Sequence, residues 1–269
     1  RRQRELTVAV HDRSEILTAK RIVVKVGSSS ISGENAGQLG ALVATLAKVH
    51  GRGTQVVLVS SGAIATGMPL LHIDNKPADL PTSQALAAVG QSRLITRYQQ
   101  VLEQFGIIAG QVLLTADDLE GNLTRTNAKN AMNRLLELGV LPIVNENDTV
   151  ATAEIRFGDN DRLAALVAEL LQADILVLLS DVDALYTAPP TEPGATRVVT
   201  VAADDQLENV KIGGSSSTVG TGGAETKVSA AKLANASGIP VLLTSTANVS
   251  VALEGQDVGT WFEPVRAGE

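Results

Sequence analysis

The sequence predicts an α/β fold with a mainly parallel sheet. Short apolar runs alternate with amphipathic segments along the 269 residues, a pattern typical of repeated strand–helix–strand units. Aromatic residues make up only 2% of the chain although 44% is hydrophobic, so Val, Leu, Ile and Ala must build the core. These residues fill central strands that helices cover on both faces. We therefore expect one large domain.

Seven apolar runs are predicted strands, and helices are expected between them. The strands are Arg21–Val26, Gln55–Ser60, Ile107–Thr115, Val140–Val144, Ile175–Ser180, Arg197–Val201 and Pro240–Thr244. Apolar residues recur at helical spacing from Leu39 to Leu46 and again from Leu163 to Leu171. Ligands of such sheets bind beyond the carboxyl ends of the strands, so the residues that follow each run are the first candidates for a site.

The acidic balance and the absence of cysteine argue against several classes of function. A formal net charge of −7 does not suit nucleic acid, whose binding requires a basic face that displaces counterions. Without cysteine there is no disulfide and no thiolate metal site. No run approaches the roughly 20 apolar residues that span a bilayer, and residues 1–20 lack the apolar core of a signal peptide. We expect a cytoplasmic protein that binds neither membranes nor nucleic acid, in which residues 1–19 form a flexible N-terminal arm.

A lysine interrupts the first predicted strand. Lys25 lies within the apolar run Arg21–Val26 and precedes the Gly/Ser segment Gly27–Ser30. A buried ammonium is costly unless an anion meets it, so we expect Lys25 to reach phosphate oxygens while backbone amides of the loop bind the same anion. The alternative is an edge strand that leaves the lysine head in water.

Two further strand ends carry small or polar residues. Ser60–Gly67 runs from the second strand into an apparent helix, whose unpaired N–H groups can bind an anion; a simple N-cap is the alternative. Asn145–Asp148 and Gly158–Asp161 offer amide and carboxylate groups that can hold an amino acid by its ammonium and carboxylate ends. Turn formation alone also favours Asn, Asp and Gly.

Two late segments suggest a nucleotide. Ser180 and Asp181 follow an apolar run and suit contacts with a base or ribose, with magnesium, or only with the turn itself. Gly220–Lys227 is a glycine-rich segment that leads into a helix and delivers a second lysine, a pattern that binds phosphates through backbone amides. The segment lacks the spacing of a P-loop, and the sequence contains neither a dinucleotide fingerprint nor a recognisable Ser–His–Asp set.

Together, and in this order, these segments resemble the amino acid kinase family, in the branch that phosphorylates glutamate. The similarity covers about residues 20–263, and its most specific runs are Ser60–Gly67 (SSGAIATG), Ala87–Leu94 (AAVGQSRL), Val144–Ile155 (VNENDTVATAEI), Phe157–Asp161 (FGDND) and Gly220–Lys227 (GTGGAETK). The resemblance implies a three-layer α/β/α sandwich around a mainly parallel sheet. It also implies ATP-dependent phosphorylation of the side-chain carboxylate of L-glutamate to γ-glutamyl phosphate, the first step of proline biosynthesis.

The resemblance further implies roles for individual residues. Lys25 and Lys227 would contact the transferring phosphoryl group, and Asp161 would orient both lysines. Glutamate would be bound by Ser61, Asp148 and Asn160. The ATP site would comprise Lys25, Ser180, Asp181, Thr221, Gly222, Gly223, Ala224, Glu225, Thr226 and Lys227. ATP is the expected co-substrate, and Mg²⁺ is expected to come with the nucleotide rather than from a protein metal site.

The same resemblance sets expectations for domains, partners and regulation. The kinase domain would span residues 20–266, without the RNA-modification-type domain that many members carry behind it. We expect a homo-oligomer such as a tetramer, feedback inhibition by proline, and a downstream glutamyl phosphate reductase as a partner. Two alternatives stay open: an acetylglutamate or aspartate kinase of the same fold, and a non-catalytic sensor of an amino acid or nucleotide.

Overall fold

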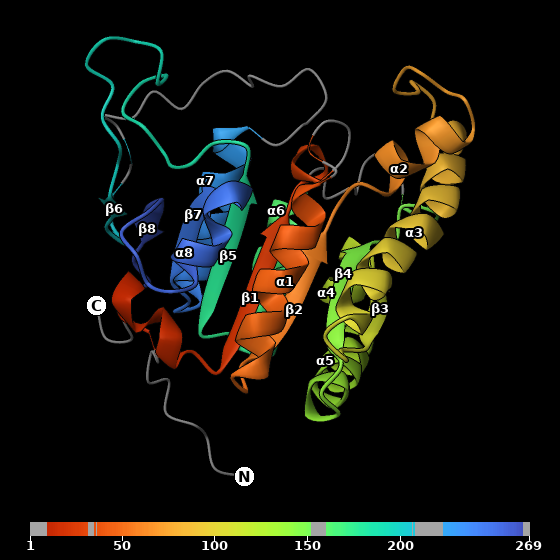
Figure 1. Cartoon of the computed structure of the whole chain (residues 1–269), viewed down its shortest axis with the longest axis horizontal. Coiled ribbons are helices and arrows are strands. Elements are labelled where there is room, and N and C mark those ends of the chain that lie inside the picture. Colours follow the sequence, from red (N-terminus) through yellow and green to blue (C-terminus); the bar gives the residue numbers. More distant parts are fainter. Residues whose placement is uncertain are drawn as a thin grey trace.

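One sheet of eight strands organises the chain in the computed structural model, which describes residues 10–31, 35, 37–151, 160–205, 207 and 223–265 (Figure 1). The strand order is β3-β4-β2-β1-β5-β7-β8-β6. The pairings among these strands are parallel except that of β7 with β8. The strands are β1 (Arg21–Val26), β2 (Gln55–Ser60), β3 (Ala109–Leu114), β4 (Leu141–Glu146), β5 (Ile175–Ser180), β6 (Thr200–Val201), β7 (Val241–Ser245) and β8 (Thr260–Phe262).

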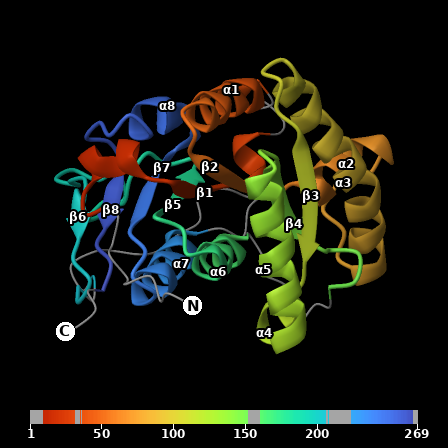
Figure 2. The same cartoon turned by 90° about the horizontal axis from the view of Figure 1, so that it is seen from below.

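Helices cover both faces of this sheet (Figure 2). One face carries α1, α3 and α8, and the other carries α5, α6 and α7. The α-helices are α1 (Gln38–Gly51), α2 (Ala63–Leu70), α3 (Leu80–Glu103), α4 (Ala116–Glu120), α5 (Asn122–Glu137), α6 (Asp161–Leu171), α7 (Ala224–Ala236) and α8 (Val249–Ala252). Short 3-10 helices are η1 (Arg13–Thr18), η2 (Ser28–Ser30) and η4 (Thr246–Asn248).

Alternating side chains of the central strands supply two separate cores. Ile22 and Val24 of β1 pack in the core under α1, whereas Val23 packs in the core under α6 and α7. This division follows from the strand itself, because successive side chains point to opposite faces of a sheet. Small aliphatic residues therefore fill both layers, and the predicted α/β/α sandwich around a mainly parallel sheet is confirmed.

The seven predicted strands correspond to β1–β7; β1, β2 and β5 have the predicted limits, and the limits of the other four differ. The predicted run Arg197–Val201 is shortened to β6, because Arg197 forms no more than an isolated bridge with Tyr186. The sequence does not predict β8, a strand of three residues that enters the sheet antiparallel to β7. The helices predicted around Leu39–Leu46 and Leu163–Leu171 are α1 and α6.

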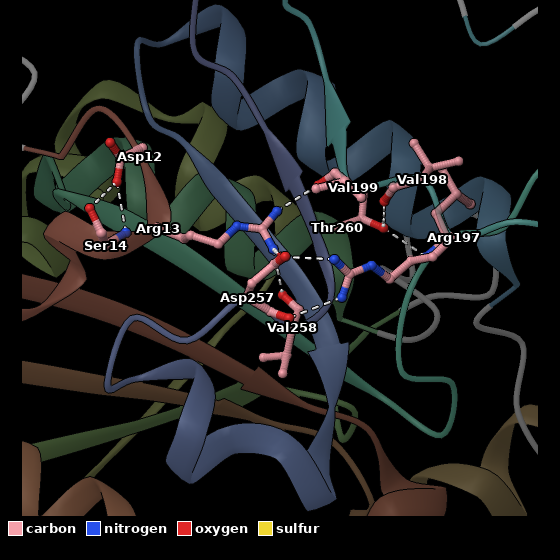
Figure 3. Close-up of polar contacts among 10 residues, drawn as sticks. Asp12, Arg13, Ser14, Arg197, Val198, Val199, Asp257, Val258 and Thr260 are labelled. Atoms are coloured by element: carbon pink, nitrogen blue, oxygen red, sulfur yellow. Dashed lines mark hydrogen bonds and ion pairs between the residues drawn. The ribbon is translucent and has the colours of Figure 1, made fainter.

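Part of the expected N-terminal arm is packed against the domain (Figure 3). Residues 1–9 lie outside the described residues, but η1 follows directly. Within η1, Arg13 donates a hydrogen bond of 2.6 Å to the carbonyl oxygen of Val199 and forms an ion pair with Asp257. The described part of the arm is therefore held to the segments that lead into β6 and β8.

Helices α2 and α3 approach each other backbone to backbone at two glycines. A Cβ atom added to Gly90 would lie 1.8 Å from the carbonyl oxygen of Ala63, and one added to Gly67 would lie 2.1 Å from that of Leu86. Only glycine permits this spacing. Because α2 begins directly after the loop that follows β2, the crossing also fixes α3 beside the carboxyl ends of the central strands.

Candidate active site

Lys25 lies in the middle of the sheet. Its strand β1 has β2 on one side and β5 on the other, and Lys25 is in register with Val59 and Leu178. The lysine is 1% exposed, and its Nζ atom lies 2.6 Å from Oδ1 of Asp161. The edge-strand alternative is therefore excluded, and the ammonium is buried against a carboxylate.

Asp161 joins two lysines through its two carboxylate oxygens. Oδ2 of Asp161 lies 3.2 Å from Nζ of Lys227 and accepts a hydrogen bond, also 3.2 Å long, from the hydroxyl of Thr226. Asp161 is fully buried and is the first residue of α6, where the helix N-terminus favours negative charge. The three residues predicted to be catalytic are thus in contact. Two buried ammonium groups held by one carboxylate leave a net positive charge that suits a polyanion.

Asn160 precedes α6 in a left-handed conformation, with φ 66°, which asparagine tolerates better than most residues. Its side-chain Nδ2 donates to Oδ1 of Asn145 at 2.6 Å and to the carbonyl oxygen of Ser60 at 3.5 Å. Asn160 is 3% exposed. This side chain therefore spans the carboxyl ends of β2 and β4, beside the pair of lysines.

The loops that follow β1 and β2 touch each other. The backbone N–H and the hydroxyl of Ser61 both donate to the carbonyl oxygen of Val26, each at 3.3 Å. Gly62 continues this loop with φ 111°, and a Cβ atom there would lie 3.3 Å from Cβ of Ser28. Ser61 consequently lies at the same edge of the sheet as Lys25.

Asp148 lines a cavity of about 450 Å³ that extends between α3 and the strands β3 and β4. Glu146 and Asn147 lie on the same wall, and Gln91 of α3 lies in the lining as well. Small apolar side chains such as Ala87 complete the wall. Carboxylates and amides in a cavity of this size provide the acceptors and donors that a zwitterionic amino acid requires.

The turn after β5 is closed by its own side chains. The Ser180 hydroxyl donates to Oδ1 of Asp181 at 3.0 Å, and the backbone N–H of Val182 donates to the Ser180 hydroxyl at 3.4 Å. Turn formation, one of the alternatives for this segment, is therefore present. Asp181 remains exposed at the carboxyl edge of the sheet, so its predicted nucleotide contact stays a prediction.

The predicted phosphate-binding loop is described only in its second half. Thr221 and Gly222 lie outside the described residues. Gly223 precedes α7, while Ala224 and Glu225 lie in its exposed first turn. Thr226 and Lys227, the last two residues of the segment, contact Asp161.

Helix α3 contributes two polar side chains that the sequence reasoning left without a role. The hydroxyl oxygen of Tyr98 lies 2.8 Å from that of Ser60, and burial raises the pKa of this tyrosine, so it stays protonated. Gln91 accepts a hydrogen bond of 2.8 Å from Nδ2 of Asn145, a buried residue of the predicted segment Asn145–Asp148. Gln91 and Tyr98 are seven residues apart and thus lie on one face of the helix. The spacing alone does not identify them in the sequence, because polar residues are common on helices.

Metal-ligating clusters and membrane helices are both missing from the described part of the chain. No three His, Asp or Glu side chains gather there in a way that would hold a metal ion. None of the helices described above is long and apolar enough to cross a bilayer.

Comparison with known sequences gives one family and a consistent set of relatives. The model of the amino acid kinase family matches residues 20–245. The glutamate 5-kinase of Leifsonia xyli subsp. xyli is 65% identical over 260 residues, which cover 96% of each protein. That of Clavibacter michiganensis subsp. michiganensis is 67% identical, over 94% of this chain and 97% of the relative. The glutamate 5-kinase of Thermobifida fusca is 52% identical over 94% of this chain but only 67% of its own length.

Comparison with solved structures agrees at the level of the fold. Carbamate kinase from Giardia lamblia bound to AMP-PNP superimposes with a TM-score of 0.68 and 17% sequence identity. The match covers 93% of this chain and all of that protein.

Proposed function

The chain belongs to the amino acid kinase family, and on this premise we propose that it transfers the γ-phosphoryl group of ATP to the side-chain carboxylate of L-glutamate. The observation that carries the proposal is the identity of 65% and 67% to two glutamate 5-kinases over nearly their whole lengths. The product is γ-glutamyl phosphate, which begins proline biosynthesis. The alternative substrates, acetylglutamate and aspartate, are not favoured by these relatives.

The acceptor needs no general base in this reaction. The side-chain carboxyl of glutamate has an ordinary pKa of about 4.3, so it is already an anion at neutral pH. The obstacle is instead the repulsion between this carboxylate and the triphosphate, followed by the spread of negative charge over the transferring phosphoryl oxygens. Fixed positive charge at the site reduces the repulsion and stabilises the negative charge that develops on the phosphoryl oxygens.

Lys25 and Lys227 supply that charge in our proposal. Support comes from their burial and from the Asp161 carboxylate, which contacts Lys25 at 2.6 Å and Lys227 at 3.2 Å. Ammonium groups held in place before the substrate arrives need no reorganisation during the reaction. Asp161 thus acts as a positioning residue, and the two lysines act on the phosphoryl group.

We assign the two substrates to opposite sides of the trio formed by Lys25, Asp161 and Lys227. Glutamate binding is assigned to Ser61, Asp148 and Asn160, because they lie at the ends of β2 and β4 or in the cavity beside them. ATP binding is assigned to the residues on the β5 and α7 side, namely Ser180, Asp181, Thr221, Gly222, Gly223, Ala224, Glu225, Thr226 and the two lysines.

Mg²⁺ enters this proposal with the phosphates. The ion usually keeps several waters and binds phosphate oxygens with one or two carboxylates, so it needs no cluster of protein ligands. Exposed Asp181 is the carboxylate at the β5 edge that suits it, whereas both oxygens of Asp161 face lysines. When bound, Mg²⁺ neutralises charge on the phosphates.

Trapping the acyl phosphate tests the proposed function. The protein is incubated with ATP, Mg²⁺ and hydroxylamine, and the hydroxamate is measured with glutamate, aspartate and N-acetylglutamate as acceptors. We expect hydroxamate from glutamate and little from the other two acids. Turnover with only another acid would move the assignment to a different carboxylate kinase, and binding without turnover would favour a sensor.

The proposal extends to regulation and assembly. Inhibition by proline is inferred from the pathway that the product enters, and adding proline to the hydroxamate assay tests it. A homo-oligomer such as a tetramer, located in the cytoplasm with a glutamyl phosphate reductase downstream, completes the proposal. Light scattering that gives a clean monomer would refute the oligomer.

A further inference from the structure

The segment Ala87–Leu94 of α3 carries part of the family resemblance but has not yet been given a role in the reaction, although Gln91 lines the cavity beside the site. Building on the proposed glutamate binding, we propose that Gln91 is a positioning residue for that substrate. Through Asn145 it fixes the orientation of the Asn160 side-chain amide, so that Oδ1 of Asn160 faces the site as a hydrogen-bond acceptor for the substrate's ammonium group.

A chain of hydrogen bonds connects Gln91 to Asn160. Oε1 of Gln91 accepts from Nδ2 of Asn145 at 2.8 Å, and Oδ1 of Asn145 accepts from Nδ2 of Asn160 at 2.6 Å. On the far side, Nε2 of Gln91 donates to Oε1 of Gln111 at 3.0 Å. The donors and acceptors alternate without conflict from α3 to the start of α6.

Two backbone groups make the direction of this chain unambiguous. The N–H of Glu146, which can only donate, lies 2.8 Å from Oδ1 of Asn145. The carbonyl oxygen of Ser60, which can only accept, lies 3.5 Å from Nδ2 of Asn160. Both amides therefore have one consistent orientation, and Nδ2 of Asn160 is directed toward the protein.

The other end of the Asn160 amide is left for a ligand. Oδ1 of Asn160 is buried and has no hydrogen-bond partner among the residues that the structure describes. A buried acceptor without a donor is unfavourable, so a substrate that brings a donor gains affinity there. At neutral pH the only hydrogen-bond donors of glutamate are on its α-ammonium group, because both of its carboxyl groups are ionised and only accept.

Asn145 depends on Gln91, because its buried side chain cannot form a hydrogen bond with water instead. Asn145 is 1% exposed, so without Gln91 its amide N–H loses its partner in the interior. Turning the Asn145 amide over would then oppose its N–H to two other donors, those of Asn160 and Glu146. Without Gln91, therefore, neither orientation of the Asn145 amide satisfies all of its neighbours. The Asn145 oxygen that accepts from Asn160 is then held less firmly, and recognition of the ammonium weakens.

The proposed arrangement also predicts the direction in which glutamate would lie. Val144 of β4, Val59 of β2 and Lys25 of β1 share one row of the sheet, so β4 and β1 are separated by two strand spacings, about 10 Å. The ammonium would lie at the β4 and β2 end and the side-chain carboxylate nearer the lysines of the trio. A five-carbon amino acid fits between the two.

Substitutions at Gln91 test the relay, with a second glutamine of α3 as the control. Gln91→Met keeps the length of the side chain but removes the acceptor, whereas Gln91→Glu keeps an acceptor for Asn145. Gln99→Met is the matched control, because Gln99 lies on the same helix and, among the described residues, hydrogen-bonds only to the backbone of residues 107 and 109. Each variant is compared with wild type for KM of glutamate, KM of ATP, kcat, Tm and inhibition by glutarate, a five-carbon dicarboxylate without an amino group.

We expect Gln91→Met to raise the KM of glutamate about 3- to 10-fold, which corresponds to the loss of one hydrogen bond. The KM of ATP and the inhibition by glutarate should stay unchanged. Gln91→Glu should recover most of the loss, and Gln99→Met should leave both KM values and the inhibition by glutarate as in the wild type. An unchanged KM for glutamate in Gln91→Met, or equal weakening of glutarate, would overturn the relay. A wild-type protein that neither binds nor phosphorylates glutamate would instead refute the proposed function itself.

Discussion

Replacing Asp161 with asparagine tests whether its carboxylate holds two buried ammonium groups. The side chains of Lys25 and Lys227 are 2% and 7% exposed, so neither can reach water when the carboxylate is removed. Breaking a buried ion pair by removal of one partner costs about 3 to 5 kcal/mol. At roughly 2 °C for each kcal/mol in a chain of this size, the Tm of Asp161→Asn should fall by at least about 6 °C.

The assay is thermal unfolding of the wild type and variant with and without MgATP. An anionic ligand should raise the Tm of Asp161→Asn by more than that of the wild type, because its phosphates supply the missing negative charge. Glu254→Gln is the matched control, since it breaks the exposed Lys48–Glu254 pair and should leave Tm nearly unchanged. A variant with wild-type Tm and a wild-type response to MgATP would refute the reasoning.

Three further substitutions have distinct expected outcomes. Lys227→Ala should lose turnover while calorimetry still detects glutamate binding; rates near wild type would remove this lysine from catalysis. Tyr98→Phe should cost about 1 kcal/mol in denaturant unfolding, through the lost hydrogen bond to Ser60. Because the folded pKa of Tyr98 is raised, its contribution is complete below about pH 10 and lost as pH rises further, so the variant should lose less stability in alkali. Arg13→Ala should lower Tm with unchanged kcat, as it releases η1 from Val199 and Asp257, and an unaltered Tm would contradict this role.

Much of the fold follows from apolar runs alone. The buried central strands β1, β2 and β5 have the predicted limits, because aliphatic residues dominate each of them. Strand β8 could not be predicted in this way, because three residues are too few to show an alternation of apolar and polar side chains. Its position depends on pairing with β7. The packing of Arg13 could not be predicted from the sequence either, because its partners are more than 180 residues away along the chain.

The lysines and Asp161 could be predicted because their residue types stand out at strand ends. A lysine within an aliphatic strand demands an anion, and the contact between Lys25 and Asp161 supplies one. Gln91 and Asn145 are different, because amides are ordinary on helices and in turns. Their role depends on which atom of each amide faces which neighbour, and only the packing of α3 against β4 determines that.

Isotope transfer from glutamate tests the central claim most directly. The protein is supplied with ATP, Mg²⁺ and hydroxylamine together with glutamate that carries ¹⁸O in its side-chain carboxylate, and the released phosphate is analysed by mass. If that carboxylate attacks the γ-phosphorus, hydroxylamine then displaces phosphate from the acyl carbon, and each phosphate retains one ¹⁸O atom. Labelled phosphate matched by hydroxamate is the predicted result. Phosphate without label would mean that water accepts the phosphoryl group, and it would contradict the proposed transfer to glutamate.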